Sequence, residues 1–152
     1  MNGQAIQIEK PELGEQALYN RIEDTLGVHV ASDHDLAEIV ESRLPTKVIG
    51  SLIRNGLTDS NVYELVIPRR TLSHRKSRRQ KLTCEESDRV VRLARTMALA
   101  EQVFGDRAKA LSWLRGPKRL FQGRAPLELL SSEAGARLVE EALYQIDDGI
   151  FG

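Results

Sequence analysis

Apolar residues recur at helical spacing along most of the chain, and this pattern predicts a protein that is essentially all helical. From Glu15 onward they are separated by three or four residues, which is the spacing of an amphipathic helix. Glycine, asparagine and proline interrupt the pattern at Gly27, at Asn55-Gly56 and at Gly116-Pro117, where we expect helices to end. Apart from the short segment Val28-His29-Val30, no stretch alternates apolar and polar residues for long enough to favour a strand.

These interruptions divide the chain into three predicted parts. Residues 1–14 lack periodicity and contain proline and glycine, so we expect a mobile tail. Residues 15–104 form the first helical domain, and residues 105–152 form a second, smaller one. The last helix is predicted to begin after Ser131 or Ser132. One face of that helix is apolar and is formed by Ala136, Val139, Leu143 and Ile146.

Two short helices are predicted in the middle of the chain, with a sharp turn between them. Thr58 or Asp59 caps the first helix, which runs to about Val66. The second helix begins at Pro68, because the fixed φ of proline suits the first helical position. Two short helices joined in this way describe a helix-turn-helix.

Basic residues are concentrated in the second of these helices, although the chain carries no net charge. Its 22 lysines and arginines balance 22 aspartates and glutamates, yet residues 69–81 hold seven basic side chains and no acidic one. Such a helix can lie in the major groove of DNA while neighbouring arginines neutralise phosphates. The alternative is a solvated surface helix. The predicted DNA contacts are Arg69, Arg70, Thr71, Ser73, His74, Arg75, Lys76, Arg78 and Arg79.

A single long helix is predicted to follow. Thr83 and Glu86 have the spacing of a capping box, in which each side chain bonds to the backbone of the other residue. The helix ends at Gly105. An apolar stripe runs along it, formed by Val90, Leu93, Met97, Ala100 and Phe104. This stripe packs either against the core of the same chain or against a second copy in a homodimer seam.

The sequence contains no recognisable catalytic or metal-binding pattern. The single cysteine excludes an internal disulfide, and the three histidines have no ligand spacing with it. There is no glycine-rich phosphate loop and no nucleophile elbow. We therefore expect a binding protein rather than an enzyme, with no cofactor and no metal ion. Since the longest stretch without a charged residue is eight residues, we expect no membrane span and a cytoplasmic protein.

Several motifs in the second half of the chain occur in the same order as in a known family. They include Trp113-Leu114 followed by Pro117, the block Gly-Arg-Ala-Pro-Leu-Glu-Leu-Leu at residues 123–130, and Glu-Ala-Gly-Ala at residues 133–136. From about Leu44 to Gly152 the chain resembles the Xre/ParS/MbcA-type antitoxins of bacterial type II toxin-antitoxin modules, the partners of RES-domain toxins. The resemblance implies an Xre-like helix-turn-helix domain followed by a small helical toxin-binding domain.

The resemblance also implies what the protein does. Such a protein neutralises a toxin encoded beside it and, with that toxin, represses their shared operon. RES toxins degrade NAD⁺ or transfer ADP-ribose, and their antitoxins place C-terminal residues over the active site. A toxin pocket that binds the pyrophosphate of its substrate is positively charged, and carboxylates at the end of this chain suit such a pocket. The predicted toxin-binding residues are Arg124, Asp147, Asp148, Gly149, Ile150 and Phe151.

Trp113, Leu120 and Phe121 are expected to be core residues of the small domain, although a role in binding is the alternative. Because pseudo-palindromic operators are read by twofold-symmetric proteins, we expect a homodimer that forms a larger complex with the toxin. The alternative to the antitoxin function is a stand-alone helix-turn-helix regulator whose C-terminal domain senses a signal or oligomerises.

Overall fold

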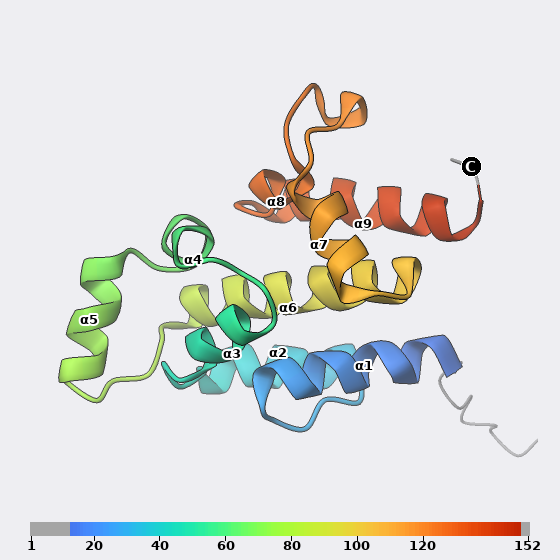
Figure 1. Cartoon of the computed structure of the whole chain (residues 1–152). Helices are drawn as coiled ribbons and strands as arrows, with labels where there is room; N and C mark the ends of the chain where they lie inside the picture. Colours follow the sequence, from blue (N-terminus) through green and yellow to red (C-terminus); the bar gives the residue numbers. More distant parts are fainter. Residues whose placement is uncertain (1–12, 150–152) are drawn as a thin grey trace, which may run out of the picture.

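The computed structural model describes residues 13–149, and within that range every regular element is a helix (Figure 1). The all-helical prediction is therefore confirmed, and Val28-His29-Val30 forms no strand. The elements are α1 (Leu13–Leu26), α2 (Asp33–Ser42), α3 (Val48–Arg54), α4 (Asp59–Leu65), α5 (Arg69–Ser77), α6 (Cys84–Phe104), α7 (Arg107–Arg115), the 3₁₀ turn η1 (Arg119–Phe121), α8 (Pro126–Leu129) and α9 (Glu133–Asp147).

The first helix begins two residues earlier than the sequence predicts. Most of the predicted tail, residues 1–12, lies outside the described residues, but Leu13 and Gly14 belong to α1. The side-chain amide of Gln102 donates a hydrogen bond to the Gly14 carbonyl at 3.0 Å. This contact from α6 supports the first turn of α1, and no local sequence signal could reveal it.

The long helix α6 is the central element of the fold. It packs against α1 and α2 on one side and against α7 and α9 on the other (Figure 1). Of its predicted apolar stripe, Val90, Leu93, Met97 and Ala100 are buried within the chain, and Phe104 is partly buried against Trp113. The stripe thus belongs to the core, so a homodimer has to use another surface.

Two arginines of α6 tie distant parts of the chain to this helix. The Arg89 guanidinium donates to the Val66 carbonyl in the turn after α4, at 3.2 Å. The Arg95 guanidinium lies 3.0 Å from the Asp33 carboxylate at the start of α2 and 3.4 Å from the Glu140 carboxylate of α9. These contacts therefore connect the turn after α4, the start of α2 and helix α9 to α6.

The helix caps follow the sequence closely, with one shift. The Thr58 side chain accepts from the Asn61 backbone at the start of α4, and Thr83 and Glu86 form the predicted capping box of α6. Ser132 caps α9. Pro68 stands one position earlier than predicted, as the N-cap of α5, because its ψ of 146° is extended and not helical.

Candidate DNA and toxin interfaces

The turn between α4 and α5 is held by buried apolar side chains. Val66 and Ile67 are 2% and 1% exposed, and their backbone N–H groups both donate to the Val62 carbonyl, at 2.9 Å and 3.1 Å. The turn is thereby fixed with two bulky residues at its centre. Its rigidity sets the direction in which α5 leaves the body of the protein.

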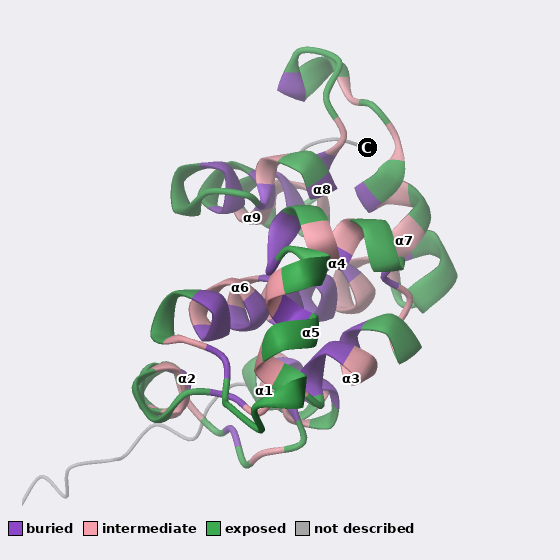
Figure 2. Ribbon diagram, turned by 90° about the vertical axis from the view of Figure 1, so that its left-hand side faces the viewer, coloured by how far each residue is buried: buried purple, intermediate pink, exposed green. Residues whose placement is uncertain are grey.

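Helix α5 presents its basic residues to solvent. Leu72 is the one residue of α5 that is buried, and Figure 2 shows the rest of the helix exposed or half-exposed on the side that faces the viewer, which is one end of the molecule in Figure 1. Thr71 is half-exposed. The exposed residues among the predicted DNA contacts are Arg69, Arg70, Ser73, His74 and Lys76, followed by Arg78 and Arg79 just beyond the helix. None of the arginines and lysines among them forms an ion pair with residues 13–149. This row of unpaired cations can neutralise a run of phosphates.

Arg75 behaves differently from the other predicted DNA contacts. Its Nε lies 3.0 Å from Oε1 of Glu86, and its Nη2 lies 3.5 Å from Oε2. Glu86 is 6% exposed and also accepts from the Thr83 backbone N–H at 2.8 Å. Burial alone would raise the pKa of Glu86, but the bonds from Thr83 and Arg75 outweigh it and lower that pKa below its usual value. Arg75 therefore fastens α5 to the start of α6.

The connection from α5 to α6 is also anchored. Arg43 donates from Nε to the Leu82 carbonyl at 2.7 Å and from Nη2 to the Lys81 carbonyl at 3.2 Å. The Leu82 N–H in turn donates to the Leu44 carbonyl at 2.9 Å. Leu82 is fully buried. These bonds fix the far end of α5, although the helix itself packs little against its neighbours.

Three aromatic rings organise the C-terminal part of the molecule. The ring centroids of Phe104 and Trp113 are 5.7 Å apart, and those of Trp113 and Phe121 are 6.5 Å apart in an edge-on arrangement. The Lys118 ammonium lies 5.5 Å from the centroid of the Trp113 ring. Such pairs favour burial with defined geometry. They tie the turn around η1, which projects from the body in Figure 1, to the end of α6.

One residue predicted to be in the core lies outside it. Phe121 is 7% exposed and Trp113 is partly buried, as expected, but Leu120 is 58% exposed. The tight 3₁₀ turn cannot direct two successive side chains into the same core. Phe121 packs on Trp113, and Leu120 consequently faces solvent.

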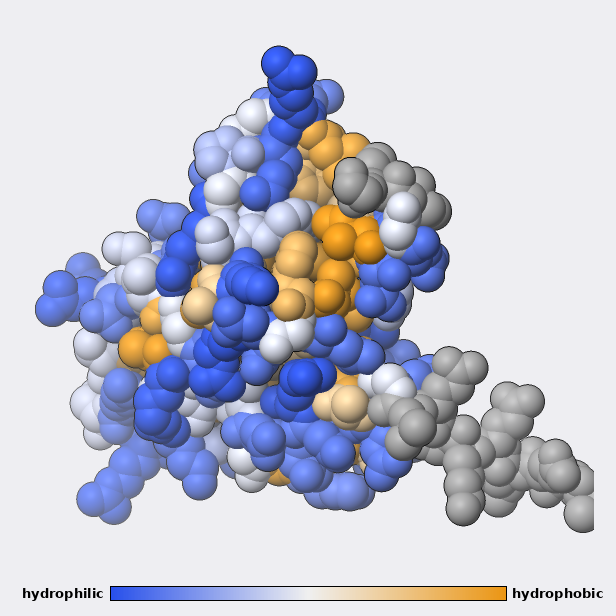
Figure 3. Space-filling model, turned by 45° about the vertical axis from the view of Figure 1, so that its right-hand side comes forward, coloured by the Kyte–Doolittle hydropathy of each residue, from blue (hydrophilic) through white to orange (hydrophobic). Residues whose placement is uncertain are grey.

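A groove with an apolar floor lies between this turn and α9. Its volume is about 420 Å³. Hydrophobic surface gathers over the C-terminal part of the molecule in Figure 3. Sequence reasoning missed the groove, although Leu138 stands outside the buried stripe of α9 and could have indicated it. The lining residues are Leu120, Phe121, Gln122, Arg124, Leu129, Leu138, Glu141, Ala142 and Gln145.

The structure distributes the predicted toxin-binding residues over two places. Arg124 lies at the groove. Asp147 and Asp148 are exposed at the end of α9, and Gly149 follows with a φ of +77°, which ends the helix. Ile150 and Phe151 lie outside the described residues. The groove and the end of α9 therefore form two candidate contacts on the same part of the chain.

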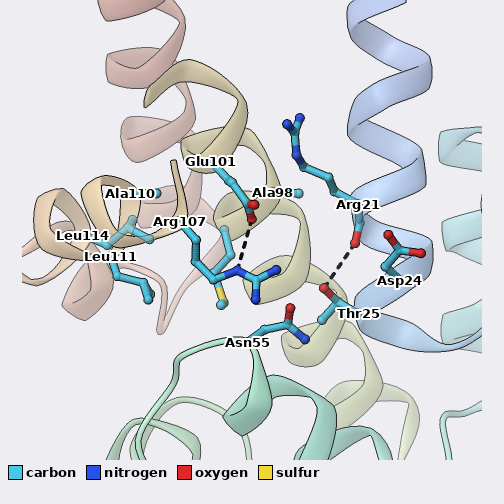
Figure 4. Close-up of a pocket in the computed structure, with 11 residues that line it drawn as sticks. Arg21, Asp24, Thr25, Asn55, Ala98, Glu101, Arg107, Ala110, Leu111 and Leu114 are labelled. Atoms are coloured by element: carbon cyan, nitrogen blue, oxygen red, sulfur yellow. Dashed lines mark hydrogen bonds and ion pairs between the residues drawn. The ribbon is translucent and has the colours of Figure 1, made fainter. Parts of the chain in front are cut away.

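A second, polar pocket of about 220 Å³ lies between α1, α3, α6 and α7 (Figure 4). Several of its polar groups already have partners: Arg107 lies 3.5 Å from Glu101, and the Thr25 hydroxyl donates to the Arg21 carbonyl at 3.2 Å. The pocket consequently singles out no ligand. Across residues 13–149 no group of three potential ligands could hold a metal ion.

Two family models match the chain in succession. Residues 35–95 match the antitoxin Xre-like helix-turn-helix domain, and residues 99–149 match the antitoxin Xre/MbcA/ParS C-terminal toxin-binding domain. An Antitoxin Xre of Pseudomonas putida is 38% identical over 79% of this chain and 76% of its own length. The chain belongs to the Xre antitoxin family. The resemblance seen in the sequence is thereby confirmed.

Further relatives extend the comparison. An Antitoxin Xre of Photorhabdus laumondii is 32% identical over 83% of this chain and 87% of its own length. A Sphingobium protein named Prs ADP-ribosylating antitoxin is 30% identical over 53% of this chain and 57% of its own length.

The two Xre family models divide the molecule within α6. The helix-turn-helix model covers α2 to α5 and most of α6, and the toxin-binding model begins in the last turns of α6. The basic helix α5 thus lies within the helix-turn-helix domain, and the groove lies within the toxin-binding domain. No helix within the described residues is long and apolar enough to cross a bilayer.

Proposed function

We propose that this Xre antitoxin neutralises a RES-type toxin that degrades NAD⁺ or transfers ADP-ribose, by covering the toxin's active site with the end of its own chain. The observation that carries the proposal is the exposed pair Asp147 and Asp148 at the end of the toxin-binding domain. The name of the Sphingobium relative, Prs ADP-ribosylating antitoxin, supports a partner of ADP-ribosylating chemistry.

The chemistry of the inhibition follows from charge. A pocket that binds the pyrophosphate of NAD⁺ needs cationic or N–H donor groups, and carboxylates can occupy the same donors through charge-assisted hydrogen bonds. Gly149 ends α9 directly after the two aspartates, so the chain leaves the helix at this point. The sequence then continues with two large apolar residues, Ile150 and Phe151, which can add buried area in a narrow pocket.

We also propose that the antitoxin, with its toxin, represses their shared operon. The exposed cations of α5 support binding to operator DNA. Reading a pseudo-palindromic operator requires two copies of the helix-turn-helix, so the proposal includes a homodimer and a larger complex with the toxin. The dimer surface lies outside the buried stripe of α6.

The test is co-expression with the open reading frame beside this gene, followed by co-purification and a measurement of cellular NAD⁺. We expect the neighbour alone to lower NAD⁺ and the wild-type chain to restore it. Changing Asp147 and Asp148 to Ala and deleting residues 150–152 should abolish the restoration. The matched control is Glu38→Ala with Glu41→Ala, two exposed acids of α2.

Two results contradict the proposal. Neutralisation that survives the loss of both aspartates and residues 150–152 removes the active-site role of the chain end. If the neighbour binds nothing and leaves NAD⁺ unchanged, the alternative function, a stand-alone helix-turn-helix regulator, takes its place. Gel-shift assays with DNA upstream of the gene then become the next experiment.

A further inference from the structure

Two leucines lie exposed in the same groove of the C-terminal part. Leu138 of α9 is 53% exposed and Leu120 of the η1 turn is 58% exposed, and both line the groove of about 420 Å³. The partly buried Leu129 also lines the groove and packs against the core. Single exposed leucines are ordinary, but neighbouring ones around a hollow are typical of a binding surface.

The walls of this groove are fixed before any partner binds. The turn around η1 is closed by hydrogen bonds from the Gly123 N–H to the Lys118 carbonyl, at 2.9 Å, and from the Lys118 N–H to the Arg124 carbonyl, at 3.1 Å. Phe121 anchors the turn on Trp113. A preformed groove loses little conformational entropy on binding, so more of the contact energy appears as affinity.

The opposite wall is α9, which is equally rigid. Its own residues Val139 and Leu143 are fully buried on the face toward the core, and Gly135 allows its first turn to approach the Leu129 carbonyl. Polar groups frame the leucines: Arg124 and Gln122 on one side, and Glu141 with Gln145 on the other. An apolar centre with a polar rim is the anatomy of a protein interface.

We propose that this leucine groove is the surface on which the partner toxin docks, by inserting apolar side chains of one helix or turn between Leu120 and Leu138. The inference rests on the proposed function. The groove lies wholly within residues 99–149, the stretch that matches the toxin-binding domain, and this selects the toxin as its occupant. Arg124 then faces an acidic group of the toxin, and Glu141 faces a basic or N–H group.

This assignment separates two tasks along α9. The groove supplies affinity through buried apolar area, and the end of the chain supplies inhibition through its carboxylates. Substitutions in the groove should therefore weaken the complex itself. Removing the chain end should leave a complex that still forms but no longer blocks the toxin.

The experiment measures the affinity of the full-length chain for the purified neighbour-encoded toxin, by calorimetry or surface plasmon resonance. Leu138→Glu and Leu120→Glu should each weaken binding about 30-fold or more, the effect of losing an interface hot spot. Both side chains are already more than half exposed, so the thermal melting temperature should stay near that of the wild type. Leu138→Ser provides a milder variant with the same expected direction.

The matched control is Ile53→Glu. Ile53 is an exposed large apolar residue too, at 37%, but it lies on α3 and away from the groove. This variant should bind the toxin as the wild type does. Equal loss of binding in Ile53→Glu would overturn the proposal, because the effect would then come from added charge alone.

Two further results also overturn it. Wild-type affinity in Leu138→Glu and Leu120→Glu means that the toxin docks elsewhere, while the antitoxin function stands. If Leu138→Glu converts a dimer into a monomer by light scattering and leaves toxin affinity unchanged, the groove takes a second copy of this chain. Failure of the wild-type chain to bind any toxin is different, because it removes the proposed function itself.

Discussion

The two ends of the molecule are built for different kinds of partner. At one end α5 buries a single side chain, Leu72, and is fastened by the ion pair between Arg75 and Glu86. At the other end three aromatic rings and a leucine groove dominate. Helix α6 connects the two ends, because it follows α5 in the chain and packs against α7 and α9 (Figure 1). A phosphate backbone requires exposed charge, whereas a folded protein partner requires apolar area on a rigid frame.

The difference also determines how each end responds to its surroundings. DNA binding through cations weakens as the salt concentration rises, because releasing counterions into a more concentrated salt solution gains less entropy. Burial of leucines is far less sensitive to salt. The DNA-binding end should therefore lose affinity steeply with ionic strength, and the toxin-binding end should not. Substitutions at one end should therefore weaken binding of one partner and leave binding of the other unchanged.

The largest effect is expected from removing exposed cations of α5. The triple variant Arg69→Ala, Arg70→Ala, Lys76→Ala should weaken DNA binding about 10²–10³-fold at moderate salt, and the slope of log K against log salt should flatten by about 2.7, if each cation neutralises one phosphate. Fluorescence anisotropy with a labelled upstream DNA fragment measures both. The matched control removes three exposed cations elsewhere: Lys109, Arg119 and Arg137. An unchanged slope in the α5 variant means that the DNA contact was misplaced.

The next largest effect is expected at the start of α9. A Cβ at Gly135 would lie 1.9 Å from the Leu129 carbonyl oxygen, which is backbone and cannot move aside. Gly135→Ala should therefore lower the free energy of unfolding by about 2–3 kcal/mol, the upper part of the usual range for overpacking. Urea denaturation measures this change. Ala134→Ser, at an exposed neighbouring position, should be nearly neutral; similar stability of the two variants would show that α8 and α9 are not so closely packed.

A smaller effect is expected from loosening α5. Glu86→Gln can keep the bond from the Thr83 N–H but loses the charge that holds Arg75. We expect a loss of about 1–2 kcal/mol of stability, since hydrogen bonds to charged groups contribute about 1.5–3 kcal/mol when buried. DNA affinity should fall without a change in salt slope, because every phosphate-binding cation remains. Glu85→Gln, at the exposed neighbouring acid, is the control.

The same pair predicts a dependence on pH. The pKa of Glu86 is lower in the folded chain than in the unfolded one, so the charged form is favoured by folding. Its contribution to stability is present at neutral pH, above the unfolded pKa, and is lost as the pH falls through the folded pKa. The stability difference between wild type and Glu86→Gln should therefore vanish in acid. A stability difference that persists in acid would show that Glu86→Gln acts through altered packing and not through the lost charge.

Local sequence signals predicted the helices and most of their caps. Thr58, Thr83 and Ser132 were placed as caps because capping depends on residues three positions apart. The exposure of Leu120 and the partner of Arg75 were missed, because both depend on how segments meet in three dimensions. The sequence showed a basic cluster at residues 69–81 but could not show which cation turns inward.

The candidate toxin surface was predictable only in part. Arg124 could be singled out because it lies in a motif of a known family, and Asp147 and Asp148 because carboxylates near the end of the chain suit a positively charged pocket. The groove between Leu120 and Leu138 could not, since its two walls are eighteen residues apart in sequence and are brought together by packing on Trp113 and α6. A surface built from segments that are distant in the sequence can be recognised only when the fold is known.

The most direct test of whether DNA and the toxin bind at separate surfaces is a reciprocal binding measurement on two variants. The α5 triple variant and Leu138→Glu are each titrated with the upstream DNA fragment and with the purified toxin. We expect a crossed result: the α5 variant loses affinity for DNA and keeps its affinity for the toxin, whereas Leu138→Glu loses affinity for the toxin and keeps its affinity for DNA. If either variant loses affinity for both partners while its melting temperature stays at the wild-type value, the two surfaces are not separate, and the proposed division between a DNA-binding end and a toxin-binding end is wrong.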